Sequence, residues 1–341
     1  MSRYSARIAL LAALIPLLFI ASLGLGPTTL SLYGFESSIA SLFGSGELHY
    51  IVTDLRLPRT AMAALTGFCL GLAGAVLQVV TRNPLASPYT FGVSAAASFG
   101  AALAIVMGAA VTGWLGRVEF YTNPLLLVAN SIAFSMASCA AIVVLTVLRG
   151  FSPVATVLFG ISMTFLFTAA TSLIECFGTS EQVAAVVFWM FGDLSRASTL
   201  SIVATLATLV PLTAIAVAEG SGFTALLLGD EVAASLGISV RRLRALGIAV
   251  ASTLVAVPTS MVGAIGFLGL IAPHIARKLV GDECRRLFLA SGLAGTLILM
   301  AADTASRIVA TPTAIPVGVL TSFLGVPLLL YVAATRSRFS A

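Results

Sequence analysis

Charged residues are scarce in this chain, and their scarcity excludes an ordinary soluble domain. Only 9% of the 341 residues are Asp, Glu, Lys or Arg, and 59% are hydrophobic, whereas a soluble domain has roughly 25% charged residues. Apolar stretches long enough to cross a bilayer as helices recur along the whole chain. The short alternating segments of a membrane β-barrel are missing. We therefore expect an all-α membrane protein embedded in a lipid bilayer.

Enzyme motifs are missing as well. There is no Gly-rich phosphate-binding loop with its Lys, so we do not expect this chain to bind ATP. The two histidines, His49 and His274, lie far apart, and no His-Glu-x-x-His motif, Gly-x-Ser-x-Gly elbow or pair of catalytic carboxylates is found. The four cysteines occur singly, without the spacing of a metal site. These absences predict a non-enzymatic chain that binds no cofactor and no metal.

About ten segments are predicted to span the membrane. They are residues 8–32, 58–80, 91–111, 124–148, 154–177, 199–218, 245–257, 262–275, 287–302 and 313–334. The apolar run 245–276 would form one helix of about 50 Å, which is too long for a single crossing. We therefore predict two short helices in this run, with a break around Pro258-Thr259-Ser260.

The distribution of basic residues predicts the orientation. With ten spans, 13 of the 18 Lys and Arg residues lie on one side, whereas a single crossing at 245–276 leaves 8 on that side and 10 on the other. Cytoplasmic loops are enriched in positive charge, so ten spans with both termini in the cytoplasm are favoured. The net charge of +5 reflects this bias, and no nucleic-acid partner is needed to explain it. We expect a single transmembrane domain over residues 1–341.

An ion-coupled secondary transporter is one interpretation of such a chain. Transporters of that class normally keep ionisable residues near mid-membrane. Here Glu175 and Asp303 lie near the outer ends of their predicted helices, and the span centres carry no charge. Asp303 and Arg307 are four residues apart, a spacing that suits a local ion pair. Ion coupling therefore remains an alternative that no residue directly supports.

Residues 219–244 form the longest polar interruption of the chain. An apolar segment stops at Gly229, Asp230 or Glu231 favours the start of a second helix, and Gly237 can end it. We expect two short helices with a small rigid surface that suits a groove of a cytoplasmic protein. The residues expected on this surface are Val232, Ala233, Ala234 and Leu236. The alternative is an amphipathic helix that lies on the membrane.

Five sequence blocks carry a family resemblance. They are LRLPRT at 55–60, GLAGAVLQVVTRNPLASPYTFGVS at 71–94, GDEVAASLGISVRRLR at 229–244, GFLGLIAPHIARKLVGDECRR at 266–286, and ADTASR with IPVGVLTSFLGVP within 302–327. In this order and combination they resemble the FecCD permeases. That family provides the membrane subunits of binding-protein-dependent ABC importers for iron–siderophores, haem and cobalamin.

The resemblance implies an architecture and a set of partners. The expected assembly is a type II ABC importer in the cell inner (cytoplasmic) membrane, with two copies of this permease domain. Two cytoplasmic ATPase subunits would hold ATP and Mg, and a periplasmic or lipoprotein substrate-binding protein would deliver the cargo. An iron–siderophore complex is the favoured cargo, with haem or cobalamin as alternatives. The loop 219–244 would carry the coupling helices, with these residues at the ATPase: Asp230, Glu231, Ala234, Leu236 and Gly237.

The resemblance also implies roles for three outer arginines. Arg56, Arg59 and Arg307 stand where family members receive acidic residues of the binding protein. A guanidinium offers a fixed fork to a carboxylate, and charges at a rim steer docking. The alternatives are anchors at helix ends or local pairs with Asp54 and Asp303.

Two turns are expected to form a cytoplasmic gate. Asn83 and Leu85 match family positions at an inner constriction, and Pro153 and Val154 match the second gate. Because the latter two replace small hydroxyl residues of the cobalamin permease, the gate chemistry stays open, and both turns have an ordinary structural interpretation.

Pathway and packing residues complete the sequence predictions. Met163 and Phe167 are suggested as pathway-lining residues, with core packing as the alternative. Glycines three or four apart, such as Gly67, Gly71 and Gly74, are expected to bring helices into close contact. Residues 178–193 resemble the short external helix that lines the mouth of the pathway in this family, with an aromatic belt at the membrane interface as the alternative.

Overall fold

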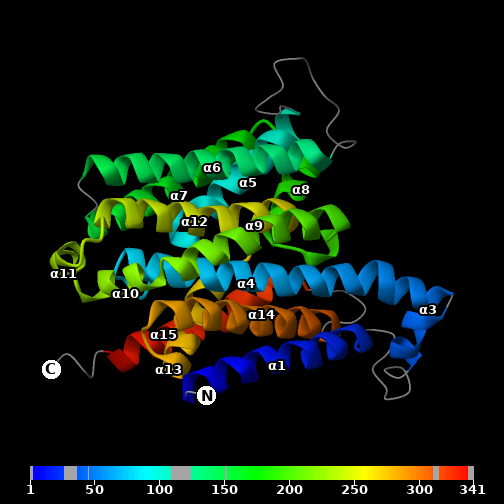
Figure 1. Ribbon diagram of the computed structural model, residues 1–341. Coiled ribbons are helices and arrows are strands. Elements are labelled where there is room, and N and C mark those ends of the chain that lie inside the picture. Colours follow the sequence, from blue (N-terminus) through cyan, green and yellow to red (C-terminus); the bar gives the residue numbers. More distant parts are fainter. Residues whose placement is uncertain are drawn as a thin grey trace.

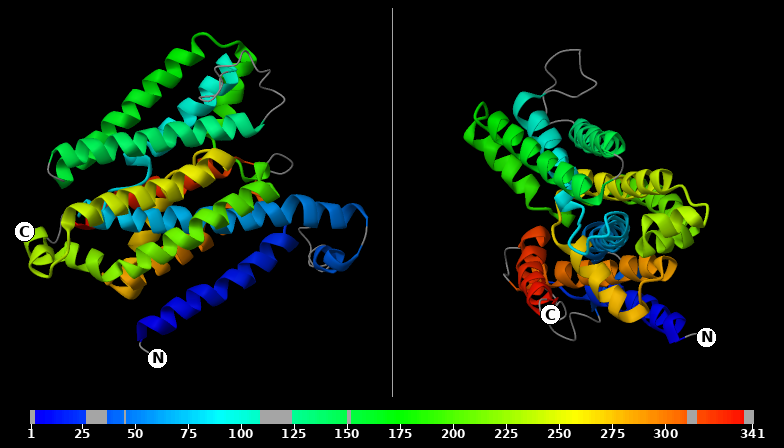
Figure 2. Two further views of the ribbon diagram at one scale, coloured as in Figure 1. Left: turned by 45° about the horizontal axis from the view of Figure 1, so that its top comes forward. Right: turned by 90° about the vertical axis from the view of Figure 1, so that its left-hand side faces the viewer.

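A computed structural model describes residues 3–26, 37–44, 46–108, 124–149, 152–309 and 315–336. The described chain forms a bundle of helices (Figure 1 and Figure 2). The long helices are α1 (Arg3–Gly24), α4 (Leu57–Val80), α5 (Val93–Met107), α6 (Pro124–Leu148), α7 (Pro153–Glu175), α9 (Thr199–Ala218), α12 (Val240–Val262), α13 (Leu268–Val280), α14 (Cys284–Ile308) and α15 (Val317–Arg336). Short helical segments connect them: η1 (Ser41–Phe43), α3 (Glu47–Tyr50), η2 (Ile51–Arg56), η3 (Tyr89–Phe91), α8 (Ser180–Met190), η5 (Leu194–Arg196), α10 (Gly220–Leu228) and α11 (Asp230–Ser235).

Each predicted span corresponds to one long helix. Seven of the described helices are long and apolar enough to cross a membrane by themselves, and Val93–Met107 and Val317–Pro327 are shorter apolar helices. The first span was predicted too long, because α1 ends at Gly24 and residues 27–36 lie outside the described part. The all-α membrane fold expected from composition is confirmed.

The predicted break at Pro258-Thr259-Ser260 is wrong. Helix α12 runs through Pro258 to Val262, and the chain leaves the helical conformation at Gly263, where φ is 84°. Phe267, with φ at 64°, then precedes α13. A proline removes one backbone donor, which a packed membrane helix tolerates, whereas a positive φ redirects the whole chain. The prediction of two helices in this run is confirmed, with the break several residues later.

Helix α4 lies at the centre of the bundle. In Figure 1, α9 and α12 lie on one side of it and α14 and α1 on the other, and α4 contacts all four. A methyl group at Gly71 would overlap the backbone carbonyl of Ser291 in α14, and one at Gly74 would overlap the carbonyl of Gly269 in α13. Close approach through small residues stabilises helix pairs in lipid. The predicted packing role of these glycines is confirmed.

Charged residues lie at both ends of the bundle. Helix α4 has 24 residues, so its ends are about 36 Å apart, which exceeds the roughly 30 Å of a hydrocarbon core. Arg59 lies at one end, and the turn after Val80 lies at the other, near α10 and α11 (Figure 1). Arg7 donates to the Leu279 carbonyl at 2.6 Å, which places the start of α1 beside the end of α13. The helices therefore separate two polar ends, as the charge distribution predicts; which end faces the cytoplasm stays a prediction.

Candidate coupling and docking sites

The polar loop folds as the two short helices that the sequence predicts. Helix α10 ends at Leu228, and Gly229 adopts a φ of 127° before α11 begins at Asp230. Helix α11 ends in a turn in which the Gly237 amide donates to Ala234 and the Ile238 amide donates to Ala233, both at 3.0 Å. Gly237, with φ at 78°, takes the left-handed conformation that glycine adopts without steric cost.

Helix α11 presents one face to solvent. Val232 and Leu236 expose 41% and 64% of their surface, and Glu231 and Ala234 are also exposed. Ala233 is fully buried against the bundle, so its predicted place on the outer surface is wrong. Adjacent residues of an α-helix point about 100° apart, so a helix that packs on the bundle turns at least one of its side chains toward the bundle. The exposed face is small and combines apolar side chains with the charged Glu231, and its partner stays a prediction.

Asp230 connects α11 to two other elements. Its Oδ1 accepts a hydrogen bond from Nη2 of Arg244 at 2.7 Å and forms an ion pair with Nη2 of Arg82 at 3.2 Å. Arg244 comes from the first turns of α12 and is almost completely buried, whereas Arg82 lies in the turn after α4. Arg82 is also one of two described non-glycine residues with a positive φ, at 48°, which costs about 1 kcal/mol. No local pattern of residues predicted this contact.

The turn after α4 has a fixed shape. The Asn83 side-chain oxygen accepts a hydrogen bond from the Leu85 amide at 2.9 Å, and the Ala86 amide donates to the Asn83 carbonyl at 3.1 Å. This arrangement is the usual Asx turn. Leu85 exposes 47% of its surface, which leaves it available to a neighbouring chain.

The second predicted gate turn lies at the start of α7. Ser152 caps this helix by accepting from the Ala155 amide at 3.5 Å, Pro153 occupies its first turn, and Val154 is 70% exposed. Proline is favoured at that position because its missing N–H has no helical partner there. Both turns therefore have a local structural explanation, and the gate role of Asn83, Leu85, Pro153 and Val154 stays a prediction.

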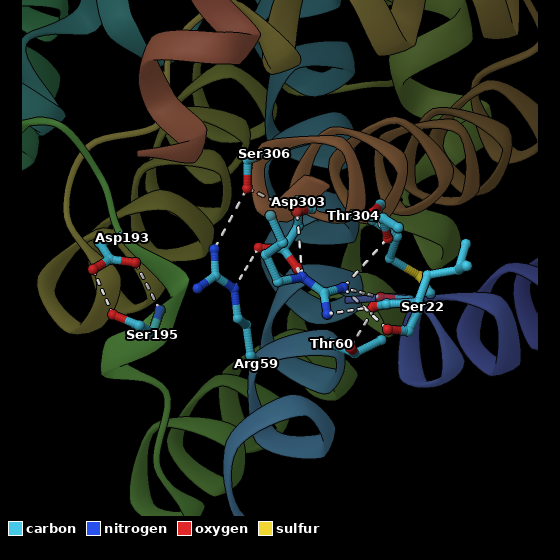
Figure 3. A network of polar contacts seen from close by, with 11 residues as sticks. Ser22, Arg59, Thr60, Asp193, Ser195, Asp303, Thr304 and Ser306 are labelled. Carbon is cyan, nitrogen blue, oxygen red and sulfur yellow. Dashed lines mark hydrogen bonds and ion pairs between the residues drawn. The ribbon is translucent and has the colours of Figure 1, made fainter. Parts of the chain in front are cut away.

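At the opposite end of α4, two arginines share a buried carboxylate (Figure 3). Asp303 is fully buried; Nε of Arg59 lies 2.7 Å from its Oδ1 and Nε of Arg307 lies 3.2 Å from its Oδ2. The local pair of Asp303 with Arg307 is thus confirmed, and the sequence missed Arg59 as its second partner. The cluster ties α4 to α14.

The end of α1 joins the same cluster. Arg307 donates to the Ser22 hydroxyl at 2.7 Å and to the Ser22 carbonyl at 3.1 Å, and Arg56 donates to the Leu23 carbonyl at 2.8 Å. Arg56 and Arg307 are only 5% and 6% exposed. A binding-protein carboxylate would have to compete with these internal acceptors. Asp54, offered above as a partner of Arg56, accepts from the Thr53 hydroxyl at 2.8 Å. Docking by the three arginines stays a prediction.

A cavity of about 760 Å³ lies between the two polar ends, on the side of α7 and α15. Hydroxyl groups of α5 and α7 line it, together with aromatic rings and one carboxylate. The lining includes Ser94, Ser98, Thr168, Thr171, Phe267 and Glu175. Glu175 is the one acidic residue among the described residues that line this cavity. A mixed lining of this kind accepts a large ligand with both apolar and polar surface.

Met163 and Phe167 lie on a different side of α7. The Phe167 ring is 5.7 Å from Phe99 in α5 and 6.4 Å from Phe134 in α6, measured between ring centroids. Met163 packs against the core beside Gly92. Their contacts agree with the core alternative. The cavity lining of α7 instead comes from residues such as Thr168 and Thr171, and the pathway role suggested for Met163 and Phe167 stays a prediction.

The predicted short external helix is α8. It begins with a capping box, in which the Thr179 hydroxyl accepts from the Gln182 amide at 3.4 Å and the Gln182 side chain accepts from the Thr179 amide at 2.9 Å. Hydrogen bonds from its own backbone amide and from Thr179 lower the pKa of the exposed Glu181 carboxyl. Met190 and Phe191, at the end of α8, line the cavity. The end of the helix therefore lies at the cavity, and its place at the mouth of a transport pathway stays a prediction.

Known proteins match nearly the whole chain. The sequence pattern of the FecCD transport family matches residues 14–335. A cobalamin import system permease protein of Halobacterium salinarum is 36% identical, over 84% of this chain and 74% of its own length. An Fe(3+)-citrate import system permease protein of Bacillus subtilis is 33% identical, over 97% of this chain and 95% of its own. The solved inward-facing conformation of a proposed metal-chelate type ABC transporter superposes with a TM-score of 0.81 at 27% identity, over 97% of this chain and 99% of that chain.

Proposed function

The chain belongs to the FecCD transport family of ABC importer permeases, and we propose that its cargo is an iron–siderophore complex. It is a multi-pass membrane subunit. We place it in the cell inner (cytoplasmic) membrane as a homodimer with two ATPase subunits that hold ATP and Mg. A periplasmic or lipoprotein substrate-binding protein delivers the cargo at the other face.

The observation that carries this proposal is the separation of two polar sites by an apolar bundle that contains a cavity. The exposed face of α11 is the proposed ATPase contact, and it lies near the end of the central helix α4. The Arg59–Asp303–Arg307 cluster lies at the opposite end of α4. A protein that carries out import with the energy of a partner needs a contact at each face and a route between them. The cavity beside α7 and α15 is the proposed route, and a second copy of the chain closes it.

Cargo is the part of the proposal for which the relatives differ. The Bacillus relative is named for ferric citrate and the Halobacterium relative for cobalamin. The volume of the cavity in one copy does not distinguish the two cargoes, because in the proposed homodimer this cavity would be only part of a shared pathway. Cobalamin is therefore retained as the second candidate because a relative at 36% identity carries that name, and haem is the third member of the test.

The experiment is transport into proteoliposomes. The chain is reconstituted alone and with its co-expressed ATPase subunits and binding protein, and uptake of a ⁵⁵Fe-loaded hydroxamate siderophore, a ⁵⁵Fe-loaded catecholate siderophore, hemin and cyanocobalamin is measured. ATP-dependent uptake of one of the two siderophores by the full complex is expected. ATP-independent uptake by the chain alone would favour a secondary transporter, and uptake of cyanocobalamin or hemin alone would replace the proposed cargo.

The docking proposal has its own test. The Arg59 side chain is 11% exposed, which makes it the more accessible arginine of the Asp303 cluster. Arg59→Glu is expected to reduce the stimulation of ATP hydrolysis by the binding protein roughly tenfold. The reason is that the new carboxylate would repel an acidic residue of the binding protein, at a cost on the order of 1 kcal/mol. Arg196→Glu, outside the cluster, is the matched control. Equal stimulation in both variants contradicts docking at this end.

A further inference from the structure

We propose that Asp230 is a positioning residue that couples α11 to the turn after α4, so that movement of α11 displaces Leu85. The inference rests on the proposed function in one respect, namely that α11 receives the ATPase. It adds a physical connection between the proposed ATPase contact on α11 and Leu85 in the turn after α4. The coupling elements are the salt bridges of Asp230 with Arg82 and Arg244.

Asp230 stands at the point where α11 can move. It is the first residue of α11, and Gly229 before it has a φ of 127° with open space where a side chain would lie. No side chain packs at that position, and the two ion pairs are the described polar contacts of the Asp230 side chain. A shift of α11 acts directly on these pairs.

The two arginines have different surroundings. Arg244 is 3% exposed and lies in the long helix α12, so it is held in place by the bundle. Arg82 is 35% exposed and lies in a turn of the chain. Both reach the same oxygen of Asp230. When that carboxylate moves, the buried arginine stays and the exposed one follows or is released, because two like charges without their shared acid repel each other.

The backbone at Arg82 carries this movement into the turn. Arg82 has a φ of 48°, its amide donates to the Val79 carbonyl, and the next amide, that of Asn83, donates to the Gln78 carbonyl, both at 3.1 Å. The Asn83 side chain then fixes the Leu85 amide. The path from the Arg82 side chain to Leu85 thus runs through three residues with defined hydrogen bonds and no long flexible segment. Leu85 is exposed and is the residue that responds.

The test reads the movement of Leu85 by fluorescence. A bimane label is placed at Leu85→Cys in a chain with Cys176→Ser, since Cys176 is the one exposed cysteine among the described residues. The chain is purified with its co-expressed ATPase subunits, and the change in bimane emission on addition of ATP with vanadate is recorded. Arg82→Gln and Asp230→Asn are compared with two controls. Arg82→Lys keeps the charge, and Arg241→Gln replaces an exposed arginine that forms neither of the Asp230 salt bridges.

The expected result separates coupling from folding. In Arg82→Gln and Asp230→Asn the ATP-dependent emission change falls roughly fivefold or more. In Arg82→Gln, which lies outside the residues expected at the ATPase, the amount of ATPase subunit that copurifies is unchanged. Arg82→Lys retains more than half of the change and Arg241→Gln retains all of it. A full emission change in both Arg82→Gln and Asp230→Asn overturns the inference. So does a labelled parent chain whose bimane emission does not change on addition of ATP with vanadate. Failure of the ATPase subunits to copurify with the parent chain instead overturns the proposed function, and with it the coupling.

Discussion

Asp303 is the buried carboxylate that pairs with Arg59 and Arg307, and replacing it is expected to destabilise the protein. Asp303→Asn keeps the size of the side chain and removes its charge, so Arg59 and Arg307 lose the anion that lies 2.7 Å and 3.2 Å from their Nε atoms. Asp303 is fully buried, and Arg307 is 6% exposed. Water therefore cannot replace the missing partner for Arg307.

The magnitude follows from this burial. Removing one partner of a buried ion pair costs about 3–5 kcal/mol because it leaves an uncompensated charge. Arg59 retains an 11% exposed side chain and can turn toward water, so the low end, about 3 kcal/mol, applies. For a chain of this size, about 1 kcal/mol shifts the melting temperature by about 2–4 °C. The expected decrease for Asp303→Asn is therefore roughly 6–12 °C.

The assay is the loss of monodisperse protein on size-exclusion chromatography after heating in detergent. Asp54→Asn is the matched control, because Asp54 is exposed and accepts a hydrogen bond from the hydroxyl of the neighbouring Thr53. Its expected shift is at most about 2 °C. The double variant Asp303→Asn with Arg307→Gln is expected to recover part of the loss, since it removes one of the unpaired cations. A decrease for Asp303→Asn no larger than that for Asp54→Asn refutes the assignment of Asp303 as the anion of this cluster.

Three further changes test other contacts. Gly71→Val places a side chain on the Ser291 carbonyl and is expected to destabilise the bundle by about 1–3 kcal/mol or more, measured by the same heating assay with Gly44→Val as a control on an open turn. Ala234→Arg puts a bulky charge on the exposed face of α11 and is expected to abolish binding-protein-stimulated ATP hydrolysis while the chain still fractionates with membranes; normal coupling contradicts the α11 contact. Thr179→Val removes the α8 cap at a cost of about 1 kcal/mol, and it is expected to speed amide hydrogen exchange in the first turn of α8 roughly fivefold, whereas equal exchange contradicts the capping role.

Local sequence signals predicted the elements of this protein well. Apolar runs long enough to span a membrane predicted the ten long helices of the described chain, and glycines beside acidic residues predicted α10 and α11. These predictions succeeded because each signal acts within a few residues along the chain. The same kind of reasoning misplaced the break in 245–276. Pro258 is a strong local breaker, but α12 is packed on several sides and continues to Val262.

Contacts between distant residues were beyond reach of these signals. The spacing of Asp303 and Arg307 predicted their pair, since both lie on one helix face, but Arg59 is 244 residues away from Asp303 in the chain. Ala233 was expected at the surface and is buried, because only the placement of α11 against the bundle decides which of its residues face inward.

The sequence by itself determined that this is a helical membrane protein with a compact polar loop and the sequence blocks of a FecCD permease, and it predicted the ten long helices found in the described part of the chain. These properties depend on hydrophobicity, charge balance and local helix signals, which are read along the chain. The tertiary structure decided which charges meet: Asp230 with Arg82 and Arg244, and Asp303 with Arg59 and Arg307. It also placed the cavity beside α7 and α15. Such contacts depend on how close the helices pack and on how each is rotated about its axis, and no residue pattern along a single chain segment specifies either.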